Sequence, residues 1–218
     1  MLQPLIRWIP IIGVVAALAL LVVATSLYSG DVRWTCVTVS LLCAPSLPDG
    51  APNSGRALPI VALLLLCASM SWLFELISRA ADTRKQRKTI QIAGIGSMVY
   101  ALLASTPMHN LMVNIALAFF LVAIVAIVYM SYRKESYVLA FAGIACILLK
   151  LSSVSLYYTN SYPEIWGVLQ KLSFILTTAW LFAVHLIPKR KTRRDVSNRC
   201  TDVADGAEVR ATITPPTW

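Results

Sequence analysis

The amino-acid sequence predicts an all-α membrane protein, a bundle of six transmembrane helices with a basic C-terminal tail. Hydrophobic residues make up 58% of the 218-residue chain and charged residues only 13%, whereas soluble globular chains are about 25% charged. The apolar residues gather in stretches of about 20, the length that crosses the hydrocarbon core of a bilayer. Six such stretches follow one another, at residues 5–28, 58–81, 89–105, 109–131, 137–158 and 163–187.

These stretches and their connections define one transmembrane domain, residues 1–188, whose one long connection is the loop 29–57. Residues 189–218 begin with a basic run and continue with few large apolar side chains. Such a composition does not bury enough surface to fold alone, so we expect a disordered tail. The first stretch has an alternative interpretation as a secretory signal peptide, although its apolar run is longer than the usual 7–15 residues.

The distribution of Lys and Arg predicts the orientation, because positive residues near span ends stay in the cytoplasm. Of the 19 Lys and Arg residues, only Arg33 and Arg56 lie in the loop 29–57, and only Lys150 and Lys171 lie deep inside predicted spans. The others lie at the start of the first span, after the last span, or at the second and fourth connections and the span ends beside them. We therefore expect a multi-pass cell-membrane protein with both termini cytoplasmic. This topology explains the net charge of +9, so no nucleic-acid partner is expected.

The two intramembrane lysines are the strongest functional signal, since ionisable groups within spans are costly. Lys150 and Lys171 are each about ten residues from the turn between the last two spans, so an antiparallel hairpin places them at similar depth, roughly 12 Å inside the outer boundary. Glu164 lies two turns before Lys171 on the same helical face. One interpretation is a water-accessible pocket that accepts an anionic group such as a lipid phosphate. The alternative is that both lysines bond to hydroxyl or backbone groups inside the bundle.

A second polar group lies at the outer turn between the third and fourth spans. His109 and Asn110 begin the fourth span, and Thr106 or Ser105 is suited to cap it, with Pro107 in its first turn. His109 has two interpretations, a histidine hydrogen-bonded at the interface or an acid, base or phosphate donor in the same leaflet as the lysines.

The cysteines and the absent motifs narrow the function further. Cys36 and Cys43 lie in the predicted outer loop, on the oxidising side, where a disulfide between them is one interpretation and two free thiols the other. The two histidines lie at opposite membrane faces, so no shared metal or haem is expected. The sequence contains no CxxC, HExxH, Walker or GxSxG motif. We therefore expect no cofactor and favour a non-catalytic protein over an enzyme.

The layout resembles the FRAG/DRAM/SFK-type superfamily of six-span membrane proteins, including its bacterial branch. The resemblance rests on a long first outer loop, a basic second connection, and the run 94–98 (Gly-Ile-Gly-Ser-Met) leading to 106–109 (Thr-Pro-Met-His). Members of this superfamily tend to carry a Pro and a His at the turn between the third and fourth spans. The resemblance implies a six-span fold over residues 5–187 and a lipid-related membrane role.

Three functions are compatible with these features. The first is an accessory protein that binds membrane lipid, anionic lipid above all, or a second membrane protein, through Lys150, Lys171, Glu164, His109 and Asn110. The second is a small transporter or channel subunit in which the lysines line an anion path, although the inner halves of the last two spans are very apolar for such a path. The third is a lipid-modifying enzyme that uses His109 and Glu164, which requires the two side chains to lie close together.

Overall fold

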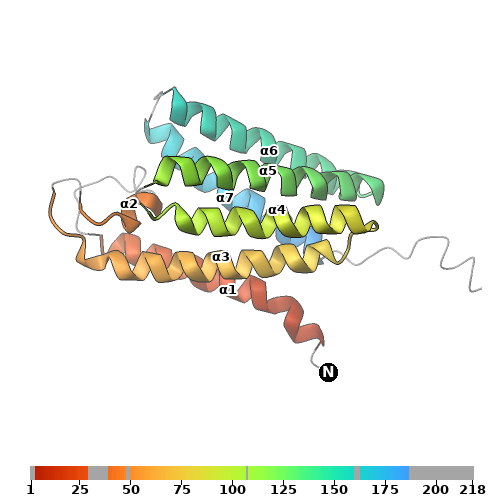
Figure 1. Cartoon of the computed structure of the whole chain (residues 1–218), viewed down its shortest axis with the longest axis horizontal. Helices are drawn as coiled ribbons and strands as arrows, with labels where there is room; N and C mark the ends of the chain where they lie inside the picture. The colour runs from red at the N-terminus through yellow and green to blue at the C-terminus, as the bar shows by residue number, and fades with distance from the viewer. Residues whose placement is uncertain (1–2, 29–38, 48–49, 107, 160–162, 187–218) are drawn as a thin grey trace, which may run out of the picture. The chain divides into compact units, whose positions relative to one another are not determined.

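The computed structural model describes residues 3–28, 39–47, 50–106, 108–159 and 163–186. Among these residues it contains seven α-helices and one 3-10 helix, with one isolated β-bridge and no strand (Figure 1). The all-α prediction is therefore confirmed. The helices are α1 (Gln3–Ser26), α2 (Val39–Cys43), the 3-10 helix η1 (Ser54–Arg56), α3 (Ala57–Ser78), α4 (Arg84–Leu103), α5 (His109–Arg133), α6 (Tyr137–Tyr158) and α7 (Pro163–Leu186).

Five helical segments in the described part of the chain are long and apolar enough to cross a membrane. They are Arg7–Ser26, Ser54–Ser78, His109–Arg133, Tyr137–Tyr158 and Ile165–Leu186. The sixth long helix, α4, does not meet this criterion, because four Lys and Arg residues occupy its first two turns. The chain thus has the architecture of a multi-pass helical membrane protein.

The long helices pack mainly against their neighbours in sequence. The contacts run from α3 to α4, from α4 to α5, from α5 to α6 and from α6 to α7, while α1 packs on α3 and α7 also touches α3. Short turns join α3 to α4, α4 to α5, α5 to α6 and α6 to α7, so each of these pairs is antiparallel (Figure 1). Residues 1–186 form one compact unit.

A core of large apolar side chains fills the centre of this unit. Phe74 and Leu73 of α3 are fully buried and pack with Ile124 and Ile127 of α5 and with Leu181 of α7. The outward faces of the same helices are also apolar, as expected for a lipid-facing surface. Small residues let the helices approach closely. Gly94 of α4 leaves the space that the Phe74 ring fills, so any side chain there would overlap the ring.

The end of the bundle that holds the α3–α4 and α5–α6 turns carries most of the described charge. Glu75 and Arg79, one helical turn apart, form an ion pair in which Arg79 Nε lies 3.0 Å from Glu75 Oε1. Lys134, between α5 and α6, donates to Ala80 O and lies 3.6 Å from Asp82 Oδ1. These bonds connect the two turns across the bundle.

The first and last helices meet at the same charged end. Arg7 donates from Nη2 to His185 O at 3.0 Å and to Leu186 O at 2.6 Å, and His185 Nε2 lies 3.1 Å from Arg7 O. The guanidinium therefore satisfies carbonyls that the last turn of a helix leaves unpaired, and its charge complements the negative end of the α7 dipole. Arg7 thus has a packing role besides the topological one that the sequence predicts.

The described half of the outer loop is ordered by side chains that bond to α2. Asn53 Nδ2 donates to Leu42 O and Ala44 O at 3.0 and 3.1 Å, and Arg56 Nε donates to Cys43 O at 3.1 Å. These bonds satisfy carbonyl groups at the end of α2, which a short helix leaves without partners of its own. The predicted tail, residues 189–218, and loop residues 29–38 lie outside the described residues.

Candidate functional site

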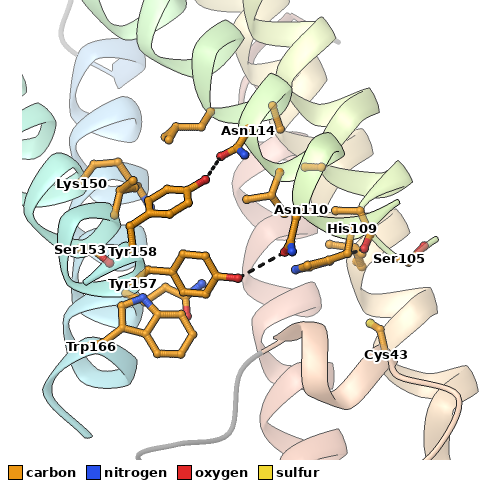
Figure 2. Close-up of a pocket in the computed structure, with 18 residues that line it drawn as sticks. Cys43, Ser105, His109, Asn110, Asn114, Lys150, Ser153, Tyr157, Tyr158 and Trp166 are labelled. Carbon is orange, nitrogen blue, oxygen red and sulfur yellow. Dashed lines mark hydrogen bonds between the residues drawn. The ribbon is translucent and has the colours of Figure 1, made fainter. Parts of the chain in front are cut away.

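A cavity of about 490 Å³ lies at the end of the bundle that carries the outer loop, and we call it the loop-side cavity. Helices α2 to α7 all contribute to its walls (Figure 2). The small side chains of Ala101, Ala104 and Ala116 leave much of this space between α4, α5 and α6. Its polar lining consists of Ser105, His109, Asn110, Asn114, Lys150, Ser153, Tyr157, Tyr158 and Gln170, with Cys43 and Trp166 beside them.

Among the residues that the structure describes, Lys150 is the one lysine that lines this cavity, and none of the lining residues is an arginine, aspartate or glutamate. It lies eight residues before the end of α6, or about 12 Å along the helix axis at 1.5 Å per residue. Ser153 and Tyr157 follow on the same helical face, one and two turns away. Among the described residues, no hydrogen bond or ion pair engages Lys150 Nζ. The cavity therefore contains a cation without an anionic partner from the described part of the chain.

Two tyrosines of α6 reach across the cavity to two asparagines of α5. Tyr157 Oη donates to Asn110 Oδ1 at 3.3 Å, and Tyr158 Oη donates to Asn114 Oδ1 at 2.5 Å (Figure 2). The Tyr157 ring also lies 5.3 Å from the Trp166 ring of α7, tilted by 36°. These contacts hold α5, α6 and α7 in register around Lys150, and each asparagine keeps its amide NH₂ as a further donor.

His109 lies on the opposite wall from Lys150, at the start of α5 (Figure 2). Its Nδ1 lies 2.5 Å from Ala104 O, a carbonyl at the end of α4. The structure thus brings Lys150, His109 and Asn110 into the lining of one cavity, a juxtaposition that the sequence predicts.

The predicted hydroxyl cap of α5 is wrong. Ser105 Oγ donates to Leu102 O at 2.9 Å and Thr106 Oγ1 to Leu103 O at 2.7 Å, so both hydroxyls bond back to the last turn of α4. The residue that precedes α5 is Met108, which makes no side-chain cap bond. Pro107 lies outside the described residues.

Of the other two predicted site residues, Lys171 lies outside the cavity lining and the Glu164 side chain lies outside the described residues. Lys171 is not among the residues that line the cavity, whereas its neighbour Gln170 is. Consecutive helical residues point about 100° apart, so one of them faces the cavity and the other does not. Lys171 has an interaction of its own elsewhere. Glu164 lies in the first turn of α7, and its side chain is outside the described ones.

Cys43 closes the loop end of the cavity, is only 4% exposed and forms no disulfide with another described cysteine. Burial raises the pKa of this thiol above its ordinary value, and the nearby Arg56 guanidinium partly offsets the rise. Its expected partner, Cys36, lies outside the described residues, so the disulfide stays a prediction. No cluster of His, Cys, Asp and Glu that could hold a metal ion occurs among the described residues.

Several lining residues are not singled out by the sequence as members of a site. Tyr157, Tyr158 and Trp166 belong to no sequence motif, and Cys43 is predicted only as a disulfide partner. Helical spacing is the signal that could have grouped them, since the lining residues of each helix lie on one face. On α6 these are residues 150, 153, 154 and 157, and on α5 they are residues 110, 113, 114 and 117.

Comparisons with known proteins give this chain no relatives: no protein-family model, no curated protein and no solved structure matches it. The resemblance to the FRAG/DRAM/SFK-type superfamily stays a prediction. The functional argument therefore depends on the chemistry of the loop-side cavity.

Proposed function

We propose that the protein crosses the cell membrane six times, with both termini in the cytoplasm and the loop-side cavity at the outer face. The uncertain span is α4. Its 20 residues correspond to about 30 Å of helix, which matches the hydrocarbon thickness. It joins α3 and α5 through short turns at opposite ends of the bundle and packs against both (Figure 1). If α3 and α5 both cross the bilayer, α4 must return the chain between them.

Within this topology we propose that the loop-side cavity binds the anionic headgroup of a membrane lipid, and that the protein acts without catalysis on lipid handling or on a membrane partner. The observation that carries the proposal is Lys150, a cation in a cavity whose other described lining residues are uncharged polar, aromatic or apolar. An isolated ammonium at that depth is costly unless an anion or water accompanies it. A lipid phosphate supplies the anion, and its acyl chains suit the apolar walls.

The other two candidate functions, a transporter or channel subunit and a lipid-modifying enzyme, receive less support. Below the cavity the bundle is filled by Leu73, Phe74, Ile124 and Leu181, all of them buried and apolar, which disfavours a polar path to the inner face. The enzymatic alternative pairs His109 with Glu164, whose side chain is not described. A lipid-related role is also what the superfamily resemblance implies.

The experiment that tests the proposal compares two lysine variants of the full-length protein by native mass spectrometry with titrated anionic lipid. Lys150→Met keeps an apolar stem of similar length and removes the charge. We expect it to weaken lipid binding by about tenfold or more, since a hydrogen bond to a charged group contributes about 1.5–3 kcal/mol.

Lys171→Met is the matched control, because it removes the same charge from the neighbouring helix outside the cavity lining. We expect it to bind anionic lipid as the parent does. Equal binding by the parent and Lys150→Met, with both proteins folded, contradicts the proposal and assigns Lys150 a purely structural role.

A further inference from the structure

The bond to Ala104 defines which nitrogen of His109 carries the proton. A carbonyl oxygen accepts and never donates, so Nδ1, at 2.5 Å from Ala104 O, must be the donor. Ala104 caps the C-terminal end of α4. Backbone carbonyls at that position accept no hydrogen bond from within the helix, so the Ala104 carbonyl is available to the imidazole N–H. In the neutral ring the other nitrogen, Nε2, is then an acceptor.

This acceptor is presented to the loop-side cavity. Nδ1 and Nε2 lie on opposite edges of the imidazole, and with Nδ1 held at Ala104 the ring extends into the space opposite Lys150 (Figure 2). Among the described residues, none donates a hydrogen bond to Nε2. The cavity thus offers two unmatched groups on facing walls, a cation at Lys150 and an acceptor at His109.

The polar groups between Lys150 and His109 are uncharged amides, which both donate and accept hydrogen bonds. Asn110 and Asn114 use their amide oxygens for Tyr157 and Tyr158 and keep their NH₂ donors. Gln170 adds a third amide, and the Trp166 ring closes the α7 side. Amides, a neutral imidazole and aromatic faces suit hydroxyl-bearing groups, whereas a bare phosphate would leave the His109 acceptor unpaired, at a free-energy cost.

We propose that the lipid recognised by the loop-side cavity has a headgroup that carries free hydroxyls beyond its single phosphodiester charge, as a glycerol-type or sugar-type headgroup does. The phosphodiester pairs with Lys150, and a headgroup hydroxyl donates to His109 Nε2. This inference rests on the proposed lipid-binding function and makes it specific, because Lys150 supplies affinity for any anionic lipid and His109 selects the hydroxylated ones.

The test uses two lipids with identical acyl chains and one negative charge each. Phosphatidylglycerol carries two headgroup hydroxyls, and phosphatidylmethanol carries none. The full-length protein is placed in nanodiscs of neutral lipid doped with one or the other, and lipid retention is titrated by native mass spectrometry. We expect the unmodified protein to prefer phosphatidylglycerol by about fivefold, the effect of one hydrogen bond between neutral groups.

His109→Asn is the diagnostic variant, because the asparagine amide still donates toward Ala104 O but has no nitrogen that reaches the cavity. It should lower the affinity for phosphatidylglycerol to that for phosphatidylmethanol and leave the latter unchanged. His185→Asn, at the opposite end of the bundle, is the control and should preserve the preference. Lys150→Met should weaken the binding of both lipids.

The outcomes separate this inference from the function on which it rests. If the unmodified protein binds both lipids equally and Lys150→Met weakens both, the hydroxyl selection is wrong while the lipid site stands. If Lys150→Met weakens neither, the lipid site itself is wrong. Competition by water-soluble glycerophosphoglycerol at the concentration of the lipid would overturn the assignment to a lipid and support a soluble ligand with the same chemistry. The comparison in the unmodified protein decides the inference even if His109→Asn does not fold.

Discussion

At the scale of single residues, Gly143 determines how α6 packs on α7. The Trp180 ring of α7 occupies the space beside Gly143, and its Nε1 donates to Leu139 O at 2.8 Å, one turn earlier on α6. A Cβ atom at Gly143 would lie 2.5 Å from both Trp180 Cζ2 and Val128 Cγ2. The bond between the indole and the backbone therefore exists because residue 143 has no side chain.

Gly143→Ala should lower the free energy of unfolding by about 1–3 kcal/mol, the usual range for overpacking a buried contact. Thermal or denaturant unfolding in detergent measures the change. Gly55→Ala is the matched control, because a Cβ at Gly55 would lie at an ordinary 3.6 Å from its nearest neighbour, Asn53 Oδ1. Equal stability of the two variants would mean that Trp180 does not pack against residue 143 as described.

The sequence groups Lys150 with Lys171, whereas only Lys150 is among the described residues that line the cavity. Distance from the turn sets the depth of both lysines, yet depth says nothing about direction. The direction is set by the rotation of α7, whose buried residues Ser173, Thr177 and Leu181 follow one another at helical spacing. Gln170, one turn before Ser173, lines the open cavity, and Lys171 is not among its lining residues. The spacing was available in the sequence, but which residues were buried was not.

At the scale of whole elements, α5 ends in a Schellman motif that contains an unusual residue. Ser136 N donates to Ser131 O and Glu135 N to Tyr132 O, each at 3.0 Å, and Glu135 has a φ of 58°. This left-handed position usually holds glycine, because a Cβ there crowds the backbone. The short α5–α6 turn therefore stores strain of about 1–2 kcal/mol at Glu135.

Glu135→Gly should raise the free energy of unfolding by about 1 kcal/mol, because it relieves this strain at a partly offsetting cost in chain entropy. Glu135→Ala removes the same carboxylate but keeps the Cβ, so it should give no such gain. Unfolding of the two variants in one detergent makes the comparison. A glycine variant that is no more stable than the alanine variant contradicts the assigned backbone conformation.

The long helices were predictable from sequence and the short one was not. Apolar stretches placed α1, α3, α5, α6 and α7 within a few residues of their bounds. The α4 helix begins earlier than its apolar stretch, because the helix includes the charged segment 84–88 that precedes this stretch. The α2 helix has five residues and depends on Asn53 and Arg56, which bond to it from about ten residues away, so local sequence alone does not specify it.

At the scale of the whole molecule, the number of membrane crossings determines whether the C-terminal tail lies on the same side as the N-terminus. Reporter fusions at Lys85 and after Arg194 should indicate the cytoplasm, because positive connections stay inside. A fusion at Thr106 should indicate the outer side if α4 crosses the bilayer. The same signal at Lys85 and Thr106 would mean that α4 does not cross, and five spans would then place the tail outside.

The site at this scale combines six helices, and only its polar members were visible in the sequence. Lys150, His109 and Asn110 were found as polar groups in an apolar chain. The cavity that unites them depends on Ala101, Ala104 and Ala116, since small side chains create the space, and an alanine in an apolar helix carries no signal of this role. The arrangement of the helices, rather than any motif, makes these residues one site.

The central claim is that Lys150 holds the anionic headgroup of a lipid inside the loop-side cavity. The most direct test is an experimental structure of the full-length protein in a lipid phase that contains phosphatidylglycerol. We predict a headgroup in the cavity with a phosphate oxygen about 2.7–3.0 Å from Lys150 Nζ. A structure in which Lys150 Nζ bonds only to hydroxyl or backbone groups of the bundle, with no lipid between α5 and α6, would contradict the claim.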